Sequence, residues 1–214
     1  MQITIDEATL QRLGIGDGRE YYPVPFEAFD TVDLGAASAT LTEPLELFKK
    51  SVAKGDQYKN FSFGDNANPL IITAFQFLHN ADFADMSSAT TDNKLIQDYF
   101  EKHSYFKFGL DEKPIFTPRM STLVPWTRVP ENGTVITTEK ENDWYTLPYP
   151  LEIPKDQVGE CTLIIAQGLT LTAGGVSLAA MPILYNYPTK ASPNASHYHC
   201  SGVFTMKGVR FVKR

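Results

Sequence analysis

Cysteine is scarce in this sequence. The chain of 214 residues has 2 cysteines, Cys161 and Cys200, which is too few for the disulfide framework of a small secreted protein. We therefore expect the chain to fold in a reducing cytoplasm. The two cysteines can still be neighbours on adjacent strands.

Basic residues are outnumbered by acidic ones, 19 against 25. The formal net charge is −6, so there is no general positive field to hold nucleic acid or an anionic membrane surface. The exception is a short basic segment formed by Lys207, Arg210, Lys213 and Arg214. We interpret this segment as a solvated end, and a weak contact with nucleic acid or an acidic surface is the alternative.

Long apolar runs are also missing. No run approaches the ~20 apolar residues that a membrane-spanning helix needs. The first residues, MQITIDEATLQRLG, carry acids where a signal peptide would be apolar. We therefore expect no membrane span and a protein that stays inside the cell. The 14 glycines and 14 prolines interrupt the apolar stretches along the whole length, which favours short strands.

Short segments rich in Phe, Ile, Val, Thr and Tyr are the predicted strands. In residues 105–110 the side chains of Phe106, Phe108 and Leu110 share one face, which predicts that this face is core. A turn is expected at 111–113. The full set of predicted strands is 45–52, 58–63, 70–80, 105–110, 114–118, 134–139, 144–153, 161–169, 176–187 and 197–212.

One helix interrupts the strands, at residues 90–103. Leu95, Ile96, Tyr99 and Phe100 form an apolar stripe along it, opposite a charged face. A single helix among many short strands does not fit an alternating parallel sheet. The pattern predicts an all-β fold, an antiparallel two-sheet jelly-roll sandwich with one short inserted helix.

The beginning of the chain has a different composition. The segment GIGDGRE is rich in turn residues, and YYPVPFEAF alternates proline with aromatic residues. We predict an extended N-terminal arm at 1–30 and a single jelly-roll domain at 31–214. The candidate interface residues of this arm are Tyr21, Tyr22, Pro23, Pro25 and Phe26.

The segment HYHC holds two histidines and a cysteine. On a strand, His197 and His199 would point to one side and Cys200 to the other, so the segment offers at most two ligands to one metal. The residues that follow contain no Asp or Glu, and nothing in the spacing brings His79 or His103 to the pair. We predict no metal and no cofactor, with a cupin-like metalloenzyme that uses His197 and His199 as a minor alternative.

Other patterns do not indicate catalysis. Glu139, Glu141 and Asp143 gather in one segment, which is typical of a solvated turn rather than of paired glycosidase carboxylates. The glycines of GIGDG follow no strong strand, and no serine has a Gly-x-Ser-x-Gly setting. We therefore expect a protein that is not an enzyme.

The aromatic residues leave a further alternative open. Trp126, Trp144, Tyr145 and Tyr149 could form a platform on which a sugar ring stacks. That platform would suit a phage tail or spike protein or another carbohydrate-binding β-sandwich module. Core packing or a contact between subunits is the interpretation we prefer.

The order of the segments resembles a known family. LELFKKSVAKGDQYKNFSFGDNANPLIITAFQFLHNADF reads as a strand, a polar link, a second strand and, after Pro69, a long apolar strand. The helix follows, and then SYFKFGLDEKPIFTPRMSTLVP, a strand, a turn and another strand. Over residues 40–212 this resembles viral jelly-roll capsid proteins of tailless icosahedral phages in the adenovirus-type double-jelly-roll lineage. Because two barrels need a longer chain, we expect a single barrel.

The resemblance implies a function. Capsid proteins of this kind are structural virion proteins that self-assemble through the sides of the barrel. Their partners are copies of themselves and other virion proteins. We accordingly expect a location in the virion, after assembly in the host cytoplasm.

Overall fold

The computed structural model describes residues 5–16, 20–36, 39–40, 44–49, 59–63, 68–79, 100–131, 134–155, 157–165, 170–171 and 199–214. The helices are α1 (Glu7–Arg12) and α3 (Met120–Leu123). The strands are β1 (Tyr21–Ala36), β2 (Ala39–Thr40), β3 (Leu45–Leu47), β4 (Leu70–His79), β5 (Tyr105–Leu110), β6 (Lys113–Phe116), β7 (Trp126–Glu131), β8 (Thr134–Glu139), β9 (Tyr145–Ile153), β10 (Gly159–Ile164), β11 (Thr170–Leu171) and β12 (His199–Lys213).

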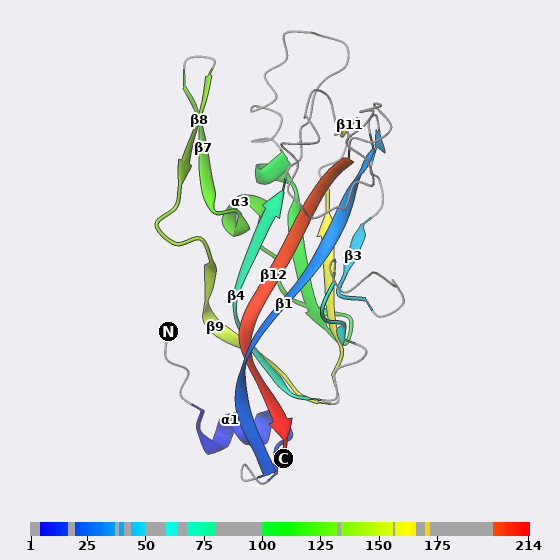
Figure 1. Cartoon of the computed structure of the whole chain (residues 1–214), viewed down its shortest axis with the longest axis vertical. Helices are drawn as coiled ribbons and strands as arrows, with labels where there is room; N and C mark the ends of the chain where they lie inside the picture. Colours follow the sequence, from blue (N-terminus) through cyan, green and yellow to red (C-terminus); the bar gives the residue numbers. More distant parts are fainter. Residues whose placement is uncertain are drawn as a thin grey trace, which may run out of the picture.

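Two antiparallel sheets of four strands form the body of the molecule (Figure 1). The first sheet has the order β1-β12-β4-β9, and the second has the order β3-β10-β5-β6. Two small two-stranded sheets, β11-β2 and β7-β8, accompany them. The predicted all-β antiparallel sandwich is therefore confirmed.

Phenylalanine rings join the two sheets. Phe106 and Phe108 alternate with more polar residues along β5 and are fully buried, as the pattern of 105–110 predicts. From the first sheet, Phe204 of β12 stacks on Phe106 with ring centroids 4.1 Å apart, and Phe75 of β4 lies 5.5 Å from the same ring. The core thus lies between the sheets, and 9 of the 23 buried residues of its main described cluster are phenylalanines.

The turn predicted at 111–113 joins β5 to β6. Asp111 and Glu112 have φ values of 49° and 66°, the left-handed backbone that a tight hairpin of this kind requires at both central positions. Asp is one of the residues that enter this region most readily. The prediction of a hairpin here is confirmed.

Residues 21–30 of the predicted N-terminal arm belong to the sandwich, which corrects our interpretation of this segment. Residues 21–30 are the first part of β1, which pairs with β12 from Tyr21 opposite Lys213 onwards. The boundary expected after residue 30 falls inside this strand. Phe26 is 7% exposed and lies in the core. The prolines are tolerated because β1 is an edge strand, where a missing N–H can face solvent.

Helix α1 covers one end of the first sheet on its outer side. The Asp6 carboxylate caps the helix by accepting a hydrogen bond from the Thr9 N–H at 2.8 Å. Ile71 alternates with residues that face the main core, so its side chain lies on the opposite face of β4. The helix and the residues after it seal this face by forming a second cluster, Leu13, Ile15, Ile71 and Phe211.

Other predictions have mixed outcomes. Of the helix predicted at 90–103, the described part, residues 100–103, is helical. Residues 58–63 form no regular strand in their described part, and the strand predicted at 176–187 lies outside the described residues. Strand β7 was not predicted, and neither were the two short helices.

The two cysteines do not lie on adjacent strands. Cys161 is in β10 of the second sheet, and Cys200 is in β12 of the first. The possibility left open by the sequence is therefore excluded, because β10 and β12 belong to different sheets.

Within the described ranges, no helix is long and apolar enough to cross a membrane.

Candidate functional site

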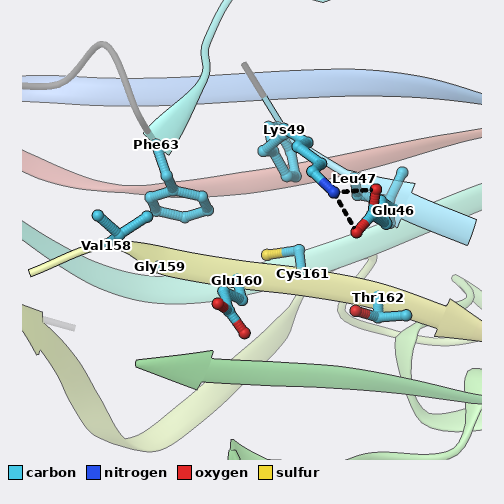
Figure 2. A pocket seen from close by; sticks show the side chains of 10 residues that line it. Glu46, Leu47, Lys49, Phe63, Val158, Gly159, Glu160, Cys161 and Thr162 are labelled. Carbon is cyan, nitrogen blue, oxygen red and sulfur yellow. Dashed lines mark hydrogen bonds and ion pairs between the residues drawn. The ribbon is translucent and has the colours of Figure 1, made fainter. Parts of the chain in front are cut away.

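A pocket of about 550 Å³ opens where β3 ends beside β10 (Figure 2). Strand β3 pairs with Cys161–Leu163 and stops at Leu47, because Phe48 has a φ of 55° and turns the chain away. The Phe48 N–H donates to Oδ2 of Asp30 at 2.6 Å, and its carbonyl accepts from the N–H of Phe63 at 3.1 Å. The early end of β3 leaves part of β10 without this neighbour, and the pocket forms there.

The pocket has an apolar and a polar part. Lys49 forms an ion pair with the Glu46 carboxylate, and both side chains are about half exposed. Glu160 and Thr162 point to the side of β10 opposite Cys161 (Figure 2). The apolar part consists of Leu47, Phe48, Phe63, Val158, Gly159 and Cys161.

Gly159 allows Phe63 to lie against β10. A Cβ atom added to Gly159 would come within 2.6 Å of the Phe63 ring, which is too close for any side chain unless the ring moved away. The ring therefore forms one wall of the pocket only because residue 159 has no side chain.

The thiol of Cys161 has little nucleophilic character in this position. The residue is 3% exposed, and burial raises the pKa of the Cys161 thiol well above its ordinary value, with the carboxylates of Asp30 and Glu160 raising it further. A thiol that stays protonated at neutral pH is a poor nucleophile. The pocket supports binding rather than thiolate chemistry.

A buried polar cluster lies at the end of β4. Nε2 of His79 lies 2.8 Å from Oε1 of Glu101, and the indole N–H of Trp126 donates to the same oxygen at 2.7 Å. The side chains of His79 and Glu101 are only 1% and 3% exposed. No pattern in the sequence predicted this cluster, because its members come from three elements far apart in the chain. Its burial indicates a structural rather than a substrate-binding role.

The predicted interface residues divide between surface and core. Tyr22 is 44% exposed, and Pro23 and Pro25 are exposed beside it on the edge strand β1. Tyr21 is half-buried. Phe26 packs into the core of its own chain, so it is not available to another molecule.

The late histidines do not yield a described site. His197 lies outside the described residues, and so do the side chains of His199 and Cys200, whose backbones begin β12. Over the part of the chain that the structure describes, His, Cys, Asp and Glu form no group of three or more that could hold a metal ion.

The basic segment is a strand rather than a free end. Lys207 lies over the Trp144 ring, 4.0 Å from its centroid, and Lys213 is 3.5 Å from a carboxylate oxygen of Glu20. Because side chains alternate along β12, these two lysines share a face and Arg210 lies on the other. The positive charges are therefore divided rather than gathered into one patch.

The remaining aromatic and acidic candidates are also dispersed. Tyr145 stacks on Phe116 with ring centroids 5.7 Å apart, and Trp126 is held by Glu101. Of the four proposed platform residues, Tyr149 is the one that is largely exposed, at 84%. The acidic residues of the segment around β8 are exposed, namely Glu139, Glu141 and Asp143.

Comparison with known proteins adds no relative: no family model matches the chain, and neither a curated protein nor a solved structure is significantly similar to it. The functional assignment therefore depends on the strand order, the core and the surface. In the part of the chain that the structure describes, the pocket beside β10 and the edge strand β1 are surface features that a function could use.

Proposed function

We propose that this chain is a jelly-roll shell protein, a structural component of a virus particle that assembles with its own copies through the sides of the barrel. The order of strand pairing carries this proposal. In chain order the strands of the two main sheets are β1, β3, β4, β5, β6, β9, β10 and β12. The first pairs with the last, the second with the last but one, and so on to β5 with β6.

Such nested pairing is that of one long hairpin rolled into a two-sheet barrel. This pairing supports a jelly roll, a fold that viral capsid domains, lectin domains and cupins share. We therefore weigh these classes against one another, and the interior and the surface supply the arguments.

The interior favours a structural role over a cupin-like enzyme. An enzyme of that kind needs space inside the barrel for a metal and a substrate. In the described core, Phe75, Phe106, Phe108 and Phe204 are fully buried and pack ring against ring between the sheets. Rings that pack between the sheets in this way suit a building block.

The surface favours assembly over sugar binding. A stacking platform needs several exposed aromatic rings in one place. Trp126 and Tyr145 are instead half-buried and have partners within the fold, and Trp144 is covered by Lys207. The dispersed arrangement supports contacts along the sides of the barrel.

The edge strand β1 is the side that we assign to the contact. Pro23 and Pro25 lack an N–H, so this part of the edge is poor at accepting a further strand through main-chain hydrogen bonds. Contact between copies would then use side chains, with Tyr22 as the central aromatic residue. Prolines at such an edge also prevent unregulated strand addition.

Assembly of the purified protein tests this proposal. Light scattering and electron microscopy over a range of concentrations are expected to show ordered particles, sheets or rings. Tyr22→Asp should lower the assembled fraction at least about tenfold, because it places an unpaired charge in the contact. The matched control is Tyr149→Asp, an equally drastic change at a largely exposed tyrosine on the opposite edge strand β9.

Two outcomes would contradict this assignment. A chain that remains monomeric at every concentration and salt condition overturns the shell function. An equal loss of assembly in both variants removes β1 from the contact and leaves the shell function standing.

A further inference from the structure

The β7–β8 hairpin stands away from the sandwich (Figure 1). Among the described residues its two strands pair with each other and with no other strand. Val129, in β7, is 53% exposed. An isolated two-stranded hairpin is marginally stable in water, so the direction in which it stands must be fixed at its base.

The first anchor is at the start of β7. Trp126, its first residue, donates its indole N–H to Oε1 of Glu101 at 2.7 Å. An indole nitrogen can only donate, so Glu101 is the acceptor in this bond. The same oxygen is 2.8 Å from Nε2 of His79, at the end of β4. One buried carboxylate thus joins the hairpin to the first sheet.

The second anchor is at the end of β8. The Lys140 ammonium group donates to the carbonyls of Ser121, Thr122 and Val124 at 2.8, 3.3 and 2.7 Å. Its main-chain N–H donates to the carbonyl of Pro125 at 2.8 Å. These carbonyls belong to α3 and the residues just after it, where a helix leaves acceptors without partners. The residue after β8 is thereby fixed to the residues before β7.

The two anchors act on neighbouring residues, because Lys140 is hydrogen-bonded to Pro125 and the next residue, Trp126, is hydrogen-bonded to Glu101. Burial lowers the pKa of Lys140, and the charge of the Glu101 carboxylate opposes part of this lowering. Strand β7 is thus bonded directly to Glu101, and the residue after β8 is bonded to the segment that leads into β7. A buried carboxylate with these donors has few other arrangements available to it.

We propose that Glu101 is a conformational anchor that holds the β7–β8 hairpin in one direction relative to the sandwich. While Trp126 and Lys140 are both engaged, the hairpin is a rigid projection. When either is released, the hairpin moves about its base. This property belongs to the single chain and does not depend on the shell function.

Distance measurement between two spin labels tests the proposal. In a Cys161→Ala, Cys200→Ser background, labels are placed at the exposed positions Thr138 in β8 and Glu27 in β1. The labelled chain is diluted with unlabelled chain, so that distances within one molecule are recorded. With the anchor intact we expect a single narrow distance distribution.

The variants release one anchor at a time. Trp126→Phe removes the indole donor but keeps a ring, and Lys140→Met removes the ammonium group but keeps the length of the side chain. Each should cause loss of the single narrow distance. Each should also speed amide exchange in residues 127–139 about tenfold, because each removes part-buried hydrogen bonds at the base of the hairpin. The matched control is Trp144→Phe, at the other tryptophan, which should change neither.

Glu101→Leu tests the anchor itself and should reproduce both effects together. If this variant fails to fold, the two single-anchor variants still test the proposal, because each keeps the buried pair of Glu101 and His79. A narrow distance retained in both single-anchor variants overturns the proposal. Equal acceleration of exchange in β4 and in the hairpin also overturns it, because that result indicates general destabilisation.

Discussion

At the scale of single residues, stability depends on the rings that connect the two sheets. Phe106 and Phe204 come from opposite sheets and stack with centroids 4.1 Å apart, and both are fully buried. We predict that Phe106→Ala lowers the free energy of unfolding by about 3–5 kcal/mol, because it leaves a cavity in a packed core. Urea denaturation measures this loss. Ile115→Ala, at a residue 49% exposed in β6, should change stability by less than about 0.5 kcal/mol. Similar losses of stability in the two variants would show that the stacked rings contribute no more to the free energy of unfolding than an exposed residue does.

The Cys161 thiol gives the fold a dependence on alkaline pH. Burial raises the pKa of this thiol in the folded chain, whereas in the unfolded chain it titrates near its ordinary value of 9.0. Above that pH the unfolded chain loses the proton and the folded chain keeps it, so stability falls as pH rises. The contribution is at most about 1.4 kcal/mol per pH unit.

Cys161→Ala isolates this contribution. The variant should be less stable than the wild type at neutral pH, because a buried side chain is shortened, but its stability should fall less steeply above pH 9.0. Urea denaturation of both proteins across this range gives the difference, in which the other titrating groups cancel. Parallel curves would mean that the thiol titrates alike in the folded and unfolded chains.

The direction in which a side chain points could be predicted where the pattern that indicates it lies within a few residues of sequence. The inward direction of Phe106 and Phe108 follows from alternation within six residues. The Glu101 cluster was not predictable, because His79, Glu101 and Trp126 meet only after three elements have packed. Nothing in the spacing of these residues distinguishes them from ordinary surface groups.

At the scale of elements, β1 and α1 contribute in different ways. We predict that deleting residues 1–16 leaves a folded sandwich that is less stable by about 3–6 kcal/mol, which is the value of burying Leu13 and Ile15. Deleting residues 1–30 should prevent folding, because it also removes most of β1 and the core residue Phe26. Circular dichroism and urea denaturation distinguish the two truncations. Equal stability of both would mean that the N-terminal part of β1 contributes nothing to the sandwich.

Elements were predicted well where composition and alternation agree, as in β4, β5, β8 and β9. Strand β1 was misread because prolines usually argue against a strand, and their tolerance depends on its place at the edge of a sheet, which only the fold reveals. Residues 58–63 show the opposite error. Phe61 and Phe63 are aromatic because they pack against the core, and burial of this kind does not require a strand.

At the scale of the whole molecule, the division into two antiparallel sheets was predictable from many short apolar segments and frequent turns. The pocket beside β10 was not. It exists because Phe48 turns away from β10 and Gly159 admits the Phe63 ring, and both facts concern backbone geometry. The side of the barrel that meets another copy is likewise a property of the folded surface, which the Tyr22 and Tyr149 variants examine.

The place of β12 has a consequence for synthesis on the ribosome. This strand lies between β1 and β4 in the first sheet, yet roughly 160 residues separate it from the end of β1. At about 5–20 residues per second, on the order of 10–30 s pass before the missing strand emerges. During that interval the nascent chain displays phenylalanine-rich segments with no neighbour to cover them. The yield of native protein in a cell will therefore depend on chaperones that shield the growing polypeptide.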